Sequence, residues 1–141
     1  MFKNLKLLFS VVLFSLTFSV SAFAQEEEVK EKALQLSVAE IQEVLSGKQI
    51  QYQSASNGTC TVDFKKDGTL ASVCAGGSGI GTYKVGKFDT KGSEDVNAKP
   101  RFCMIYSYKP NEPFCSILYR RSDGSVWFSA NKIKLLIIKE I

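Results

Sequence analysis

The residues of this chain best able to do covalent chemistry are four cysteines, Cys60, Cys74, Cys103 and Cys115. Their spacing contains no CxxC pair, the pattern typical of zinc sites and of thioredoxin-like redox centres. The chain has no histidine, which removes Ser-His-Asp and Cys-His nucleophiles, histidine metal ligands and imidazole acid–base catalysis. We therefore expect these cysteines to form disulfides, and we expect no metal and no cofactor.

Carboxylates are the other groups that could catalyse a reaction, working as an acid and a base in a pair. The candidates are Asp63, Asp67, Glu94, Asp95 and Asp123. Each has a structural reason for its position. Asp67 and Asp123 fit turns, Asp63 fits the outer face of a hairpin, and Glu94 and Asp95 fit a polar loop. We therefore expect a protein that is not an enzyme.

The first 24 residues predict the compartment in which the cysteines work. Lys3 and Lys6 precede an apolar run over residues 7–20, and Ala22-Phe23-Ala24 is a small-x-small cleavage site. This is the pattern of a secretory signal peptide, and the run is shorter than the roughly 20 residues of the alternative, an uncleaved membrane anchor. We expect a periplasmic or secreted protein without a membrane span after cleavage, in which cysteines oxidise.

Cleavage after residue 24 leaves 117 of the 141 residues, enough for one domain with a modest core. Residues 25–35 are charged and predict a flexible leader, and residues 36–141 predict a single β-rich domain. Loss of Lys3 and Lys6 lowers the 18 basic residues to 16, against 14 acidic residues. Because these charges are interspersed, we expect no nucleic-acid partner.

One short helix is predicted at the start of this domain. Ser37 and Glu40 have the spacing of a capping box, in which each side chain bonds to the backbone of the other residue. Apolar residues then recur with helical spacing up to Gly47, which supplies the left-handed stop. The pattern predicts a helix over residues 38–46 with its apolar face formed by Val38, Ile41, Val44 and Leu45.

After the helix, apolar residues alternate with polar ones and turns recur about every ten residues, which predicts an antiparallel β domain. We expect a small antiparallel β-barrel or meander, preceded by the helix and stapled by disulfides. The glycine-rich residues 75–81 match no phosphate-binding loop and predict a flexible connection. Residues 89–100 predict a polar loop. Strands are expected at residues 49–54, 59–64, 69–74, 82–85, 101–108, 114–121, 125–130 and 132–141, although a helix fits the last segment as well.

Turn chemistry predicts the first disulfide. If Gly68 takes the left-handed position of a three-residue hairpin loop, Cys60 lies directly across from Cys74 on the neighbouring strand. Cys103 and Cys115 can share a face only if residues 105–113 form a wide, unpaired loop. Four cysteines allow three connectivities. We favour these two pairs, with bridges between the two hairpins as the alternative.

Several motifs in this order resemble a known protein group. They are Leu-Ser-x-x-Glu-Ile and Leu-Ser-Gly-Lys within residues 36–48, Phe-x-x-Asp-Gly-Thr at 64–69, Gly-Thr-Tyr-x-Val at 81–85, and the two Phe-Cys pairs followed by Leu-Tyr-Arg and Asp-Gly. This set resembles the DUF995-type group of small exported bacterial proteins. The resemblance implies a short lipocalin-like β-barrel or meander and carries no established activity. The chain departs from the group at Tyr83, where a Trp is common, and by its extra pair Cys60 and Cys74.

We expect the protein to bind an unknown protein or small ligand in the cell envelope or outside the cell. Aromatic residues near arginines are favoured at contact surfaces. The candidate contact surface is formed by Tyr106, Tyr108, Tyr119, Arg120, Arg121 and Trp127. The alternative is that Trp127 and Phe128 straddle the sheet as packing residues and that the arginines are merely solvated.

Two other functions fit a small disulfide-stapled β domain. An inhibitor of an extracytoplasmic hydrolase, such as a lysozyme or a protease, would use the rigid loops at residues 89–100 and 109–113. A carrier of a small apolar ligand would instead need an internal cavity rather than a filled core. The tertiary structure distinguishes a cavity from a filled core.

Overall fold

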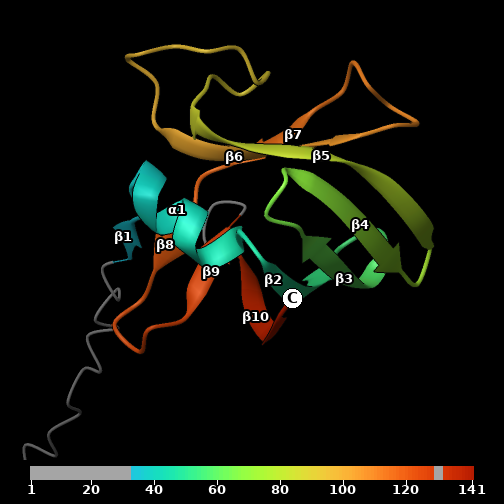
Figure 1. The fold of residues 1–141 in the computed structure, drawn as a ribbon. Coiled ribbons are helices and arrows are strands. Elements are labelled where there is room, and N and C mark those ends of the chain that lie inside the picture. The colour runs from blue at the N-terminus through green and yellow to red at the C-terminus, as the bar shows by residue number, and fades with distance from the viewer. Residues whose placement is uncertain (1–32, 129–131) are drawn as a thin grey trace, which may run out of the picture. The chain divides into compact units, whose positions relative to one another are not determined.

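The computed structural model describes residues 33–128 and 132–141, which form one mainly β unit (Figure 1). The predicted signal peptide, most of the predicted leader and residues 129–131 lie outside the described residues. None of the described helices is long and apolar enough to cross a bilayer. The elements are β1 (Leu34–Gln35), α1 (Val38–Leu45), β2 (Lys48–Ser54), β3 (Gly58–Phe64), β4 (Thr69–Cys74), β5 (Gly77–Lys87), β6 (Pro100–Tyr106), β7 (Phe114–Ser116), β8 (Tyr119–Arg120), β9 (Val126–Phe128) and β10 (Ile133–Glu140).

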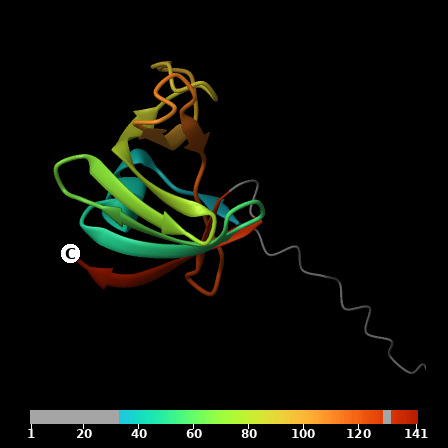
Figure 2. The same cartoon turned by 90° about the vertical axis from the view of Figure 1, so that its right-hand side faces the viewer.

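In the described part of the chain, ten antiparallel strands form one sheet in the order β1-β8-β9-β10-β2-β3-β4-β5-β6-β7. Strands β2 to β7 follow one another as a meander, and β10 enters between β9 and β2. The sheet curls into half a barrel, and Figure 2 shows β2 to β5 wrapping round its side. The predicted mainly β fold with one short helix is confirmed, and the C-terminal segment is a strand rather than a helix.

Helix α1 covers part of the inner face of this sheet. The Ser37 hydroxyl accepts from the Glu40 amide at 3.2 Å, and the Glu40 carboxylate accepts from the Ser37 amide at 2.8 Å, as the capping box predicts. The helix contacts β2, β5 and β6, which lie on different sides of the curl. The core comprises Leu36, Ile41, Val44, Leu45, Ile50, Val62, Phe64, Leu70, Tyr83, Phe102, Met104, Leu118, Val126, Phe128 and Leu135.

Both predicted disulfides are present, Cys60–Cys74 and Cys103–Cys115. Gly68 has a φ of +86°, and the register of the β3–β4 hairpin sets the first two cysteines directly opposite each other. Cys103 likewise lies opposite Cys115, and their strands stop pairing beyond Met104 and Phe114. The predicted wide loop is therefore confirmed.

The prediction of a flexible connection at residues 75–81 is wrong, because β5 already begins at Gly77. Its backbone pairs with β4 along residues 77–82 and with β6 along residues 81–87. A Cβ atom at Gly81 would collide with the Ile105 carbonyl of β6. Glycine inside a strand marks such a close backbone approach, so these glycines belong to the sheet rather than to a linker.

The single strand expected at residues 114–121 is divided into β7 and β8. Strand β7 pairs with β6, whereas β8 pairs with β9 and with β1. Leu118, between the two strands, is fully buried, and its carbonyl accepts from the Leu36 amide at 2.8 Å. Because β1 pairs with β8, Leu34–Gln35 forms part of the sheet, although the sequence assigns these residues to the leader.

The two disulfides close short loops, with sequence separations of 14 and 12 residues. Replacing Cys60 and Cys74 together by alanine is expected to lower the free energy of unfolding by about 3 kcal/mol, because the unfolded chain regains the freedom of that loop. Urea unfolding followed by circular dichroism measures the loss.

The matched control is Thr61→Ala with Val73→Ala, a pair directly opposed in the same two strands on the other face of the sheet. A loss of stability no larger than that of the control would contradict the expected role of the disulfide.

Candidate functional site

The inner face of the sheet changes character along its strands. Side chains on one face of a strand recur every second residue. On β2, Ile50 belongs to the core, whereas the following inward residues Tyr52 and Ser54 line a cavity. On β4, Leu70 belongs to the core, whereas Ser72 lines the same cavity. The filled core therefore passes into an open space within the curl of the sheet.

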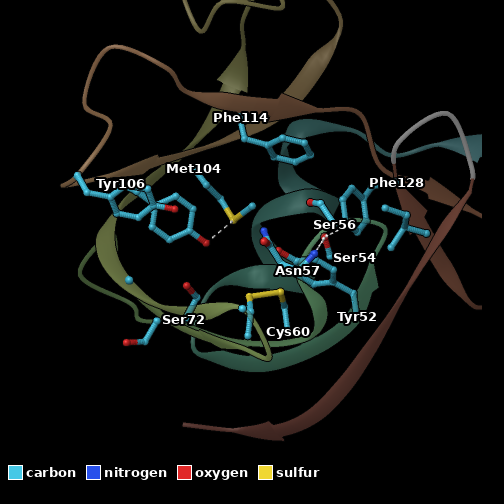
Figure 3. Close-up of a pocket in the computed structure, with 17 residues that line it drawn as sticks. Tyr52, Ser54, Ser56, Asn57, Cys60, Ser72, Met104, Tyr106, Phe114 and Phe128 are labelled. Atoms are coloured by element: carbon cyan, nitrogen blue, oxygen red, sulfur yellow. Dashed lines mark hydrogen bonds between the residues drawn. A yellow bond between two sulfur atoms is a disulfide. The ribbon is translucent and has the colours of Figure 1, made fainter.

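This cavity has a volume of about 510 Å³ (Figure 3). Its wall combines aromatic rings, sulfur atoms, hydroxyl groups and bare backbone. The aromatic residues are Tyr52, Tyr106, Tyr108, Phe114 and Phe128, and the sulfur atoms belong to Met104 and to the Cys60–Cys74 disulfide. The polar side chains are Ser54, Ser56, Asn57, Ser72 and Ser78. Concave sites that combine apolar rings with a set of placed polar groups are the usual sites for small molecules.

The rings on one side of the cavity hold one another at fixed angles. Phe128 lies edge-to-face against Tyr52, with ring centroids 5.2 Å apart, and against Phe114, with centroids 6.0 Å apart. Edge-to-face pairs are favourable beyond their buried area. Phe128 is 2% exposed, which anchors this cluster in the core. These rings therefore form a preformed wall.

The opposite side depends on the absence of a side chain at Gly79. A Cβ atom there would lie 3.0 Å from the Tyr106 ring and 3.1 Å from the Tyr108 ring. The two tyrosine rings lie 5.5 Å apart with an angle of 31° between their planes. Glycine on β5 thus lets both rings lie directly on the strand backbone.

Polar groups gather where the loops meet the cavity. The Ser54 hydroxyl accepts from the amides of Ser56 and Asn57 at 3.4 Å and 3.3 Å, which shapes the β2–β3 turn. The Asn57 carbonyl accepts from the Gly76 amide at 3.3 Å, so this turn is joined to the next one. Two adjoining turns thus place hydroxyl and amide groups at the cavity wall.

The half-buried phenols of Tyr52 and Tyr106 resist ionisation. Burial, together with the neighbouring Tyr106 and Tyr108 side chains, raises the pKa of Tyr52 to about 12. Burial also raises the pKa of Tyr106, although a hydrogen bond with the Ser72 side chain acts in the opposite direction. Both phenols therefore carry their protons at neutral pH.

The structure separates the predicted contact surface into two groups. Tyr106 and Tyr108 line the cavity, whereas the other four predicted residues lie on or next to the β8–β9 hairpin. There Tyr119 lies opposite Trp127, and the Arg121 guanidinium lies 3.4 Å from the centre of the Trp127 ring. The exposed residue Arg120 pairs with Leu34 of β1.

Trp127 and Phe128 point to opposite faces of β9, because consecutive side chains alternate along a strand. Phe128 lies in the core and lines the cavity, and Trp127 is half-buried on the other face. The Trp127 indole nitrogen donates to the Ser125 hydroxyl at 2.7 Å.

Sequence reasoning missed most of the cavity wall. Tyr52, Ser72, Met104 and Phe114 were not among the predicted site residues, although all four line the cavity. The alternation of inward and outward side chains along each strand could have placed these four residues on the inner face. The pattern could not have shown how far along the strands the filled core extends.

Compared with protein-family models, curated proteins and solved structures, the chain matches none. The resemblance to DUF995-type proteins therefore stays a prediction.

The raised pKa of Tyr52 predicts how stability changes in alkali. Between pH 10 and pH 12 an unfolded tyrosine loses its proton while the folded Tyr52 keeps it. The contribution of Tyr52 to stability is thus complete below pH 10 and is lost as the pH rises towards 12. We expect the free energy of unfolding to fall less steeply over this range in Tyr52→Phe than in the wild type. Denaturant unfolding at stepped pH values measures both slopes, and equal slopes would contradict the assignment.

Proposed function

We propose that the chain is an exported, non-enzymatic binding protein that holds a small, largely apolar ligand inside its curled sheet. The observation that carries this proposal is the cavity of about 510 Å³ lined by five aromatic side chains. Burial of apolar ligand surface against such a wall supplies the main driving force for binding, about 25 cal/mol per Å².

The rigidity of the wall supports the same function. Cys60–Cys74 joins β3 to β4 within the wall itself, and Cys103–Cys115 joins β6 to β7 beside Phe114. A wall that is ordered before the ligand arrives loses little conformational entropy on binding. The two disulfides are also compatible with export to the periplasm or the medium.

Filling the cavity is expected to abolish binding. Ser72→Phe adds an aromatic ring to a 5% exposed inward position on β4, and it should displace the ligand that co-purifies with the wild type. Native mass spectrometry of protein purified without denaturation would show the added mass in the wild type and a bare chain in the variant. Organic extraction would identify the compound.

The matched control is Val73→Phe, which places the same ring on the other face of β4, where Val73 is 65% exposed. This variant should retain the added mass. A wild type that carries no added mass, and that gains no thermal stability from any compound of an apolar library, would refute the proposal.

A second candidate is binding of a partner protein through the β8–β9 hairpin. Arginine stacked on tryptophan combines two residue types that dominate contact energies, and the stacking of Arg121 on Trp127 favours this surface. Trp127→Ala should then weaken capture of a specific envelope protein at least tenfold. If the captured protein is an extracytoplasmic hydrolase, the result would support a function as an inhibitor of that enzyme.

The control for this pull-down is Ile80→Ala, which alters a 67% exposed side chain on β5. Identical captured proteins for the wild type, for Trp127→Ala and for the control would set the second candidate aside.

A further inference from the structure

We infer that the ligand of this cavity is an uncharged molecule with a flat, conjugated ring and a hydrogen-bonding group at one edge. This inference rests on the proposed function and narrows the ligand to a chemical class. Three features of the wall carry it: the absence of ionised side chains, the arrangement of the rings, and the position of the hydroxyl and amide groups.

No lysine, arginine, aspartate or glutamate is among the described residues that line the cavity. Its titratable side chains are the phenols of Tyr52, Tyr106 and Tyr108. The rest of the wall consists of a disulfide, a thioether, neutral hydroxyl and amide groups and apolar side chains. A charged ligand would lose part of its water here without meeting a counter-charge, which is costly. The wall therefore selects against carboxylates, phosphates and sulfonates.

A cation also meets no carboxylate in this wall. Aromatic faces attract cations, so the rings alone would tolerate one. However, Phe128 already meets both Tyr52 and Phe114 edge-to-face, and the wall offers no carboxylate to balance the charge. The uncharged form is thus favoured over the cationic form.

Aromatic rings lie on two sides of the cavity, which favours a ligand with a flat ring. Tyr106 and Tyr108 pack on the backbone at Gly79. Figure 3 shows Tyr106 on one side of the cavity and Phe128 on the other. A conjugated ring can stack on or meet the edge of these rings, a gain that a saturated ring of the same size lacks. The polar turn at Ser54 to Asn57 then faces an edge of the ligand.

Two fluorescent probes that share one ring system test the charge preference. N-phenyl-1-naphthylamine is neutral, and 8-anilinonaphthalene-1-sulfonate carries a sulfonate on the same skeleton. The neutral probe is expected to bind one site of the disulfide-bonded protein with an affinity at least about tenfold higher than that of the anionic probe. Equal binding of the two probes, or tighter binding of the anion, would overturn the inference.

Competition against the neutral probe tests the preference for a conjugated ring and the preference for the neutral over the cationic form. 1-Naphthol is expected to displace it at concentrations about two- to tenfold lower than decahydro-1-naphthol, which has the same skeleton without conjugation. Trimethyl(1-naphthyl)ammonium should be a weaker competitor than 1-naphthol. Equal displacement by the saturated alcohol, or stronger displacement by the cation, would overturn the inference.

A charge introduced into the wall should change the preference in a known direction. Met104→Lys replaces an unbranched inward side chain by a cation of similar length, and it should shift the ratio of the two affinities towards the anionic probe at least tenfold. The matched control is Ile105→Lys, the next residue on β6, which does not line this cavity and should leave the ratio unchanged.

The failure of this inference is distinguishable from the failure of the proposed function. If neither probe binds, the cavity takes no apolar molecule and the proposed function falls with the inference. If both probes bind equally and both are lost in Ser72→Phe but not in Val73→Phe, the cavity is a ligand site and only the neutral preference is wrong.

Discussion

The structure depends on a mismatch of length between one short helix and the sheet that it covers. The eight residues of α1 span about 12 Å, whereas a seven-residue strand such as β2 or β3 spans about 23 Å. A single helix of this length cannot bury the whole inner face. The sheet is curled, and part of its inner face packs on Ile41, Val44 and Leu45 while the rest encloses a cavity.

The positions of the disulfides follow from this mismatch. A small β domain with a core on only part of its inner face has limited hydrophobic stabilisation. Cys60–Cys74 lies where Val62 and Phe64 of the core give way to the cavity along β3, and it crosslinks β3 to β4 at that point. Cys103–Cys115 holds the three-residue strand β7, and with it Phe114, against β6. The covalent bonds thus support the wall that the helix leaves uncovered.

The same curl assigns the aromatic residues to two environments. Tyr52, Tyr106 and Phe128 point inward, where burial raises the pKa of the two phenols, while Trp127 lies on the outer face against Arg121. A chain rich in aromatic residues near arginines therefore need not carry one continuous contact surface. Here the inward group suits a small molecule, and the outward group suits a flat partner surface.

The amino-acid sequence by itself determined what depends on nearby residues. The capping box at Ser37, the turn at Gly68 and the cross-strand disulfide beside it follow from local backbone preferences, and they were predicted correctly. Only the tertiary structure decided what depends on distant strands. Residues 77–81 belong to β5 because the backbones of β4 and β6 pair with this strand. Residues 114–121 are divided because their first part pairs with β6 and their last part pairs with β9. The cavity belongs to this second kind. It depends on where helix α1 stops covering a sheet in which the last strand, β10, pairs with both β9 and β2.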